Sequence, residues 1–306
     1  MRKFGLNFIF VILAVVFMSS TAFAVTPERE TRYEEAIQQV AAETEKEPAF
    51  SHKVESFYRY MPVAHVEHQD GKVGLMEAGS EYELEFKAFD KFPVSFSLNA
   101  GYIGVNNSTV VPLPAKLTAT TADVEITLPF FKVDKTHFRF GISPSLFGDD
   151  WNFKPSNFRI PSRYYMIHQP NDKLTFILGL AYFPQYRDQF MPIAGLVYEP
   201  NDKWAFNIVP PRPTIVYSLN SKISLFAEAG MDSDEYEVDY QNTHTEILEY
   251  SGNRAGAGIN YEFNKHVECS FSVGGTFGRQ LKYRESFGKV NVDDGMYAEF
   301  RIVASI

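Results

Sequence analysis

Regular alternation of apolar and polar side chains is the feature of this sequence that most restricts its fold. From about Val54 onward the chain carries many such runs, for example "VSFSLNAGY", "HFRFGIS", "VECSFSV" and "AEFRIVASI". In the first run Val94, Phe96 and Leu98 share one face, and serine and asparagine share the other. A period of two residues is that of a β-strand with one apolar and one polar face. We therefore expect an all-β domain over residues 51–306.

Short turns of one chemical type separate the predicted strands. The tetrapeptide "PNDK" stands at Pro170–Lys173 and again at Pro200–Lys203. Looser versions stand at Phe89–Lys91, Val133–Lys135, Asn220–Lys222 and Asn264–Lys265. Asn, Asp and Pro favour tight turns, and Lys stays in water. The other connections are longer, with Asn106–Thr120, Gly148–Pro161, Met231–Thr243 and Glu285–Asp294 as the predicted loops.

This asymmetry of the connections predicts an up-and-down antiparallel transmembrane β-barrel. Outer-membrane barrels have short periplasmic turns and longer outer loops. Six short turns separate seven pairs of strands, which gives 14 strands. The number falls to 12 if Val54–Val66 and Leu75–Ala88 do not both enter the wall. Aromatic residues beside the short turns predict an interfacial girdle: Phe131, Tyr198, Trp204, Tyr217, Tyr261 and Phe263.

Two predicted strands are shorter than the others. Trp204–Val209 and Thr214–Leu219 are near the lower limit for a span of about 9–11 residues. The segment "PPRP" at Pro210–Pro213 joins them. Because proline cannot donate to a strand ladder, this segment predicts a tight outer turn on an exposed rim.

The N-terminal residues differ from the rest of the chain. Arg2 and Lys3, the apolar run Phe8–Phe17 and the small residues Ala22 and Ala24 predict a signal peptide over residues 1–24. Residues 25–50 predict a short acidic amphipathic α-helix and a linker, because apolar side chains recur with helical spacing. This periplasmic helix would serve as a tether, a plug or a lid on the barrel.

Charge and cysteine content restrict the partners. The formal net charge is −9, and removal of the signal peptide takes away two positive charges. Because phosphate binding needs a basic face, nucleic acid is not an expected partner. Cys269 is the only cysteine, so no intramolecular disulfide forms. The expected partners are outer-membrane lipid, the barrel-assembly machinery and small polar solutes.

No motif points to covalent chemistry. "HVEH" places His65 and Glu67 on one face of a strand and His68 on the other, so a metal site is not expected. A lipid-modifying enzyme would need a nucleophile beside an oriented histidine. His137, His168, His244 and His266 lie near serines or acids, but none lies in a nucleophile motif. We expect no enzymatic activity, no cofactor and no metal.

The polar faces of the strands predict the residues that line the lumen. If the apolar faces contact lipid, ten charged residues point inward: Glu83, Glu85, Lys87, Glu125, Arg139, Glu228, Glu262, Glu268, Glu299 and Arg301. Seven of these ten are acids, which predicts a negative lumen and a preference for cations if the barrel conducts. A closed interior of paired charges and small residues is the alternative.

The segment "GLVYEPNDKWAFNIVPPRPTIVYSLNSKISLFAEAG", Gly195–Gly230, resembles a group of bacterial outer-membrane barrel-like proteins known only as a domain of unknown function. That resemblance implies the fold and an outer-membrane location, and it transfers no catalytic residue. The expected function is a channel for small polar solutes or cations, selected by lumen width and charge. The alternative is a structural or surface-interaction barrel, and an outer-membrane lipid-modifying enzyme is a third possibility.

Overall fold

The computed structural model describes residues 50–89, 91–130, 133–240, 244–285 and 287–305. The predicted signal peptide lies outside these described residues, and so does the predicted helix with its linker, apart from Phe50. No helix in the described ranges has the length and apolarity needed to cross a bilayer.

The described residues form 17 strands. The first nine are β1 (Phe50–His65), β2 (Lys72–Ala88), β3 (Phe92–Asn107), β4 (Lys116–Pro129), β5 (Thr136–Ile142), β6 (Ser145–Gly148), β7 (Phe158–Arg159), β8 (Ser162–Asn171) and β9 (Leu174–Tyr182). The others are β10 (Phe190–Asn201), β11 (Trp204–Ile208), β12 (Thr214–Ser218), β13 (Ile223–Tyr240), β14 (His244–Asn264), β15 (Val267–Tyr283), β16 (Lys289–Val292) and β17 (Gly295–Ser305).

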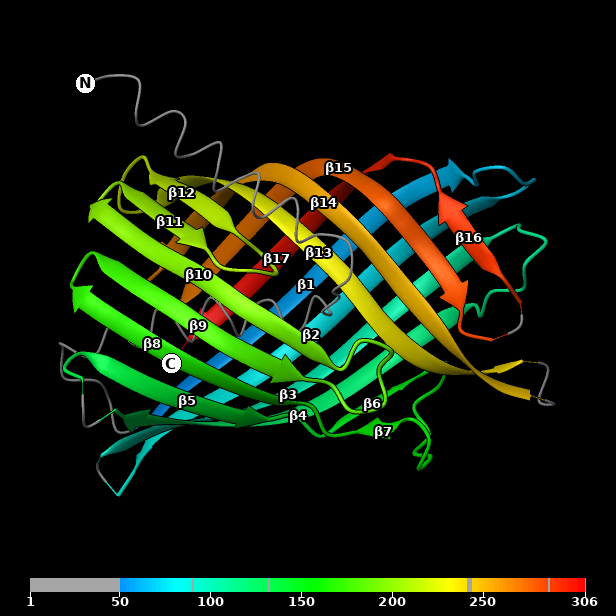
Figure 1. The fold of residues 1–306 in the computed structure, drawn as a ribbon. Coiled ribbons are helices and arrows are strands. Elements are labelled where there is room, and N and C mark those ends of the chain that lie inside the picture. Colours follow the sequence, from blue (N-terminus) through cyan, green and yellow to red (C-terminus); the bar gives the residue numbers. More distant parts are fainter. Residues whose placement is uncertain (1–49, 90, 131–132, 241–243, 286, 306) are drawn as a thin grey trace, which may run out of the picture.

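These strands close into one antiparallel barrel (Figure 1). β1 pairs with β2 on one side and with β17 on the other, which joins the two ends of the sheet. β5 and β6 are one interrupted strand, since both pair with β4, and β16 and β17 both pair with β15. β7 and β8 likewise pair in turn with β6 and β5. The wall therefore has 14 strands, which confirms the preferred number and shows that 12 is wrong.

The connections separate into two ends, as the sequence predicts. All six predicted short turns lie at one end of the barrel, called the turn end below. At the opposite, loop end, three predictions are wrong. Met231–Thr243 is mostly strand, because β13 and β14 stay paired up to Tyr240 and His244. Glu285–Asp294 contains β16, and Gly148–Pro161 contains β7.

The acids of β13 explain the first of these errors. Glu235 and Asp239 suggest a solvated loop by their charge, but each has a cationic partner from a neighbouring segment. Arg284 binds Glu235, and Lys154 Nζ lies 2.6 Å from Asp239 Oδ2. Backbone pairing with β14 can therefore continue through an acidic sequence.

The outer face of the barrel is apolar along the strands. Leu98, Phe271 and Phe300 are 47–49% exposed, whereas their neighbours Ser97, Ser272 and Glu299 are buried. Tyr198, Trp204, Tyr261 and Phe263 are exposed beside the short turns, and the rings of Trp204 and Tyr217 lie 4.7 Å apart. Phe131 lies outside the described residues. An apolar band with aromatic side chains at one border is the arrangement of a transmembrane β-barrel.

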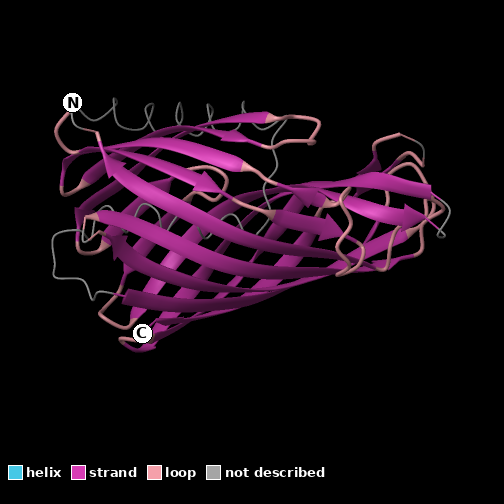
Figure 2. Cartoon of the chain, turned by 90° about the horizontal axis from the view of Figure 1, so that it is seen from below, coloured by secondary structure: helices cyan, strands magenta, loops and turns pink. Residues whose placement is uncertain are grey.

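The barrel narrows toward its loop end, as Figure 2 shows. There the end of β6 extends beyond its pairing with β7. Its last residue, Gly148, forms a parallel bridge with Glu237 of β13. The backbone N–H of Asp149 also donates to the carbonyl of Glu237, at 3.1 Å. Val66 and Val292 link β1 to β16. These contacts form a smaller ring at the loop end, made of β13, β14, β15, β16, β1, β2, β3, β4 and β6. The segment from β8 to β12 lies outside this ring.

Candidate functional site

The interior of the small ring is filled by apolar side chains from the wall itself, which we call the closing core. Leu117, Phe147, Leu248 and Val290 have no exposed surface. The remaining buried members are Met61, Val66, Val73, Leu75, Ile103, Val105, Ala119, Tyr236, Val238, Tyr250, Leu281, Tyr283, Val292 and Tyr297. Because protein cores pack at the density of organic crystals, this layer of described residues occupies the interior of the barrel at the loop end.

A layer of ion pairs lies next to the closing core and is called the central charged layer. Its members are Glu55, Arg59, Glu77, Arg212, Glu228, Asp232, Arg254, Glu299 and Arg301. Arg59 is fully buried, and its guanidinium lies 2.6 Å from Glu77 and 2.7 Å from Glu299. Tyr250 of the closing core donates to Glu77 at 3.1 Å, so the two layers are in direct contact.

The turn between β11 and β12 contributes to this layer. Arg212 is buried and lies 2.5 Å from Glu228 and 3.3 Å from Glu299. Glu228 also accepts hydrogen bonds from Ser272, at 3.1 Å, and from Tyr297, at 2.9 Å. The prediction that Pro210–Pro213 forms an exposed rim is therefore wrong. The turn directs Arg212 into the lumen, because two carboxylates compensate its charge there.

A second group of ion pairs lies on β4, β5 and β8. Arg163 binds Asp123 and lies 2.8 Å from Glu125. Arg139 lies 3.8 Å from Glu125 and donates through Nε to Thr127 at 2.8 Å. All four charged side chains are buried or nearly so, which makes this group a second polar region of the interior.

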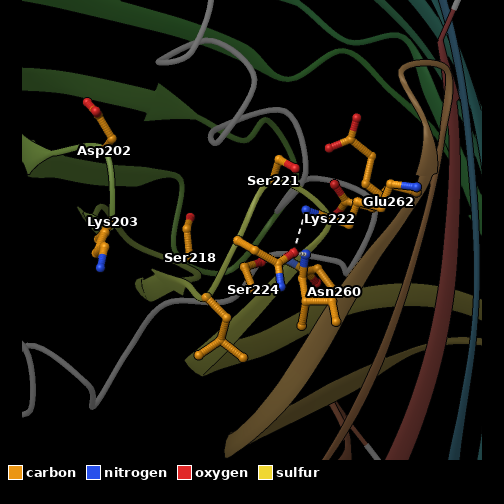
Figure 3. Close-up of a pocket in the computed structure, with 12 residues that line it drawn as sticks. Asp202, Lys203, Ser218, Ser221, Lys222, Ser224, Asn260 and Glu262 are labelled. Atoms are coloured by element: carbon orange, nitrogen blue, oxygen red, sulfur yellow. Dashed lines mark hydrogen bonds between the residues drawn. The ribbon is translucent and has the colours of Figure 1, made fainter.

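The turn end is wider and holds a polar pocket of about 460 Å³ (Figure 3). Lys222, Asn260, Glu262 and Glu268 line it, together with Ser218, Ser221 and Ser224. Asn260 donates to Ser224 at 3.2 Å. Glu262 and Glu268 are direct cross-strand partners on β14 and β15. Asp202 and Lys203 also line the pocket, so it is a polar cavity with three acids and two lysines at the turn end.

The ten lumen residues predicted from sequence lie in different environments. Glu228, Glu299 and Arg301 meet in the central charged layer, and Glu125 and Arg139 meet in the second group. Glu83 is buried and accepts a hydrogen bond from Ser95 at 2.7 Å. Glu262 and Glu268 line the pocket. Glu85 is half-buried and Lys87 is exposed, and neither belongs to the two groups of ion pairs.

Several interior charges were missed by the sequence analysis. Those in the two groups of ion pairs are Glu55, Arg59, Glu77, Asp123, Arg163, Arg212, Asp232 and Arg254, and other buried charges such as Glu81 and Asp234 were missed as well. The alternation of inward and outward side chains along a strand could have identified some of these residues. Glu77 lies an even number of residues before Glu83, and Asp123 lies two residues before Glu125. With these residues the central charged layer has five acids and four arginines, which is a formal net charge of −1.

No group of three or more His, Cys, Asp and Glu side chains in the described ranges has a geometry suited to a metal ion. His168 contacts the hydroxyl of Thr136 at 2.9 Å, and His266 contacts the carbonyl of Ser305 at 2.8 Å. These contacts place both rings at the turn end.

Residues 137–298 match the model of DUF6268, a domain of unknown function. The chain belongs to the DUF6268 family. The match contains the whole of Gly195–Gly230, where the sequence resembles such a group, and that prediction is confirmed. No curated protein matches the chain.

Solved structures of membrane barrels show a distant likeness to this DUF6268 protein. An outer membrane channel from Pseudomonas putida F1 has 11% identity and a TM-score of 0.44, over 87% of this chain and 98% of that one. The translocator domain of the autotransporter NalP from Neisseria meningitidis has 11% identity and a TM-score of 0.38, over 90% and 95%. A Pseudomonas aeruginosa FadL homologue has 10% identity and a TM-score of 0.38, over 84% and 90%.

Proposed function

We propose that this DUF6268 protein is a bacterial outer-membrane channel for small molecules, and that its axial path is closed in the conformation described. The predicted signal peptide, the apolar outer band and the aromatic side chains at the turn end support an outer-membrane location. The short turns then face the periplasm. The role needs no covalent chemistry, because selection by width, charge and polarity is enough.

The central charged layer is the observation that carries this proposal. Buried ion pairs contribute little net stability, since apolar residues of similar volume are often as stable or more stable in their place. This same barrel fills its loop end with apolar side chains from the same strands. A purely structural interior could have continued that filling. Keeping Arg59, Arg212 and Arg254 in the middle of the barrel supports a function that uses a polar lumen.

The balance of acidic and basic side chains in the lumen affects how strongly the channel prefers cations. Glu262 and Glu268 of the turn-end pocket favour cations locally, and Lys203 and Lys222 in the same lining weaken that effect. The layer above it is nearly neutral, so we expect a weaker cation preference than the acidic residues alone would give. Small polar solutes or cations can fill the turn-end half of the lumen, and passage beyond it requires a change in the closing core or another exit.

Planar-bilayer recording on the full-length protein tests the proposal. We expect a mostly closed baseline with brief openings, and more frequent openings when the closing core is loosened by Leu117→Ala with Leu248→Ala. Leu225→Ala is the matched control, because Leu225 is 43% exposed on the outer face. Complete silence of the wild-type protein and of the loosened variant, both shown to be folded, would overturn the channel proposal.

That silent outcome would favour the second candidate, a structural or surface-interaction barrel. The specific observation in its favour is that the closing core is built from the wall strands themselves, with Leu117 of β4 and Leu248 of β14 both fully buried. A plug of that construction is more costly to open than a loop folded into the lumen.

A further inference from the structure

The wall of the barrel contains an interrupted seam between β10 and β13. Only the short hairpin of β11 and β12 lies between these strands, and each of its strands has five residues (Figure 1). A spanning strand needs about 9–11 residues, so the hairpin ends well short of the loop end. Beyond its tip, β10 continues from Ala194 to Phe190, and β13 continues past Met231.

The edge of β10 that faces the seam can be identified from its hydrogen bonds. Glu199 N–H donates to Lys173 O on the β9 side, and Gln189 O accepts from Phe183 N–H on the same side. Because backbone groups alternate along a strand, Phe190, Pro192 and Ala194 direct theirs toward the seam. Proline has no N–H, so Pro192 leaves no donor unpaired at this edge.

The facing edge is completed by the hairpin tip, residues 209–213, and by Arg159 of β7. Ala229 N–H donates to Pro213 O at 3.0 Å, and Met231 N–H donates to Pro211 O at 3.2 Å. Farther along β13, Arg159 donates to the carbonyl of Glu235 at 2.7 Å. Pro210, Pro211 and Pro213 of the tip also lack an N–H.

Prolines of this kind are the residues that an edge inside a membrane requires. An unpaired backbone group in hydrocarbon is costly, which is why membrane barrels normally close every edge. Four prolines border this seam, and each removes one backbone N–H from its border. They lower the number of donors that need a partner at the interruption.

The interior behind the seam is apolar, unlike the central charged layer and the turn-end pocket. Met191 and Ile193 of β10 and Val209 of the tip are 2–6% exposed and belong to one buried cluster. The other members are Tyr165, Ile167, Ile177, Ala181, Phe183, Tyr186 and Val197. Gly195 permits close approach of the tip, because a Cβ there would lie 2.7 Å from the Val209 side chain. Outside, Phe190 is 55% exposed.

We propose that this seam is a lateral entrance through which a small apolar molecule passes between the outer half of the bilayer and the barrel interior. The inference rests on the proposed channel function, and it adds a separate route for apolar molecules beside the polar lumen of the turn end. The occupant is apolar because Phe190 and Ala194 face outward and Met191, Ile193 and Val209 face inward at the same place. A strand from a second copy fits less well, since it would find no donor at Pro192.

Cysteine labelling in liposomes tests this entrance. In a Cys269→Ser background of the full-length protein, Ile193→Cys places a thiol behind the seam, and Ile103→Cys places one on the inner face of an intact wall. Both native side chains are buried isoleucines. N-cyclohexylmaleimide dissolves in the bilayer, and a sulfonated maleimide stays in water. We expect the apolar reagent to label Ile193→Cys at least about tenfold faster than Ile103→Cys, because it enters from the hydrocarbon.

Two further variants sharpen the result. Ala194→Phe should fill the seam and lower the labelling rate of Ile193→Cys toward that of the control. Ser221→Cys in the turn-end pocket should react with the sulfonated reagent, which verifies access from water. Equal rates for Ile193→Cys and Ile103→Cys would overturn the entrance. Faster labelling of Ile193→Cys by the sulfonated reagent than by the apolar one would also overturn the entrance. The same holds if a dimer of the protein, detected on a gel, protects that thiol, because the seam would then be covered by a second copy.

Labelling does not depend on flux, so the two proposals fail separately. A barrel that shows no openings in a planar bilayer yet labels rapidly through the seam loses the channel proposal and keeps the lateral entrance. A barrel that conducts but labels no faster at Ile193→Cys than at Ile103→Cys keeps the channel and loses the entrance.

Discussion

Arg59 Nη2 on the first strand of the barrel lies 2.7 Å from Glu299 Oε2 on the last strand, inside the lumen. β1 and β17 are also joined by a backbone ladder in which Arg59 and Glu299 are direct partners. The ion pair therefore fixes the register of the closing strands from the inside. It also links two chain segments that are 240 residues apart.

Removing this guanidinium should destabilise the barrel strongly. Arg59→Met keeps most of the side-chain volume but leaves Glu77 and Glu299 buried with one partner fewer. Breaking a buried pair from one side costs about 3–5 kcal/mol. Unfolding by guanidinium chloride in detergent measures the loss. Lys53→Met is the control, because the Lys53 side chain is 26% exposed and lies 3.6 Å from Glu55. Arg301 still lies 2.6 Å from the Glu55 carboxylate in that variant, so the loss should be clearly smaller. Equal losses would show that Arg59 has no special role.

A charge on the outer face should impair membrane assembly according to depth. Phe271 is 49% exposed and far from the short turns, so Phe271→Arg should cost about 2–4 kcal/mol in the middle of the bilayer. Phe263 lies beside the turn at Asn264, and Phe263→Arg should cost about 1 kcal/mol or less. The heat-dependent shift in gel mobility reports the folded fraction. Similar effects at both positions would contradict the assigned bilayer boundary.

The closing core should respond to truncation as a packed protein interior does. Leu248→Ala removes a fully buried side chain and should cost about 2–5 kcal/mol, from lost burial and the cavity that remains. Leu225→Ala makes the same chemical change at a lipid-facing position and should cost clearly less, because lipid replaces the missing contacts. Denaturant titration of both variants provides the comparison. A greater loss at Leu225 would mean that the inner and outer faces have been exchanged.

The pair of Lys154 and Asp239 at the loop end lies outside the apolar band. The hydrogen bond from Lys154 lowers the pKa of Asp239 below its usual value. A depressed pKa means that this contact stabilises the fold above the unfolded-state pKa and is lost as the pH falls through the folded-state pKa. Lys154→Met should therefore raise the pKa of Asp239 toward the reference value of about 3.9. Titration of the Asp239 carboxyl by carbon NMR measures the shift, and an unchanged pKa would remove Lys154 as its cause.

The same experiment has a natural control in Thr245, which also donates to Asp239, at 3.0 Å. Thr245→Val should raise the pKa of Asp239 by less than Lys154→Met does, because a neutral hydroxyl stabilises the carboxylate less than an ammonium group. Both variants should leave the wall strands unchanged, since neither side chain enters the lumen.

Local sequence determined the strands, their outward faces and the short turns. The outward positions of Leu98, Phe271 and Phe300 follow from period-two alternation, and the turns at "PNDK" follow from residues that favour tight reversals. Six such turns were enough to give 14 strands, because each short turn pairs two neighbours in the chain. The family resemblance over Gly195–Gly230 also rested on local sequence. These features depend on residues a few positions apart, which a sequence displays directly.

The division of the interior was decided only by tertiary structure. Alternation says that Ile103 and Ser97 share a face, but it does not say that Ile103 enters a closing core while Ser97 faces a polar lumen. That difference arises because β6 crosses to β13 and narrows the barrel at one end. Likewise, a proline-rich turn could equally have been an exposed rim. Arg212 points inward because Glu228 and Glu299, brought together by barrel closure, compensate its charge. Contacts between segments distant in the chain set both outcomes, and local patterning carries no information about them.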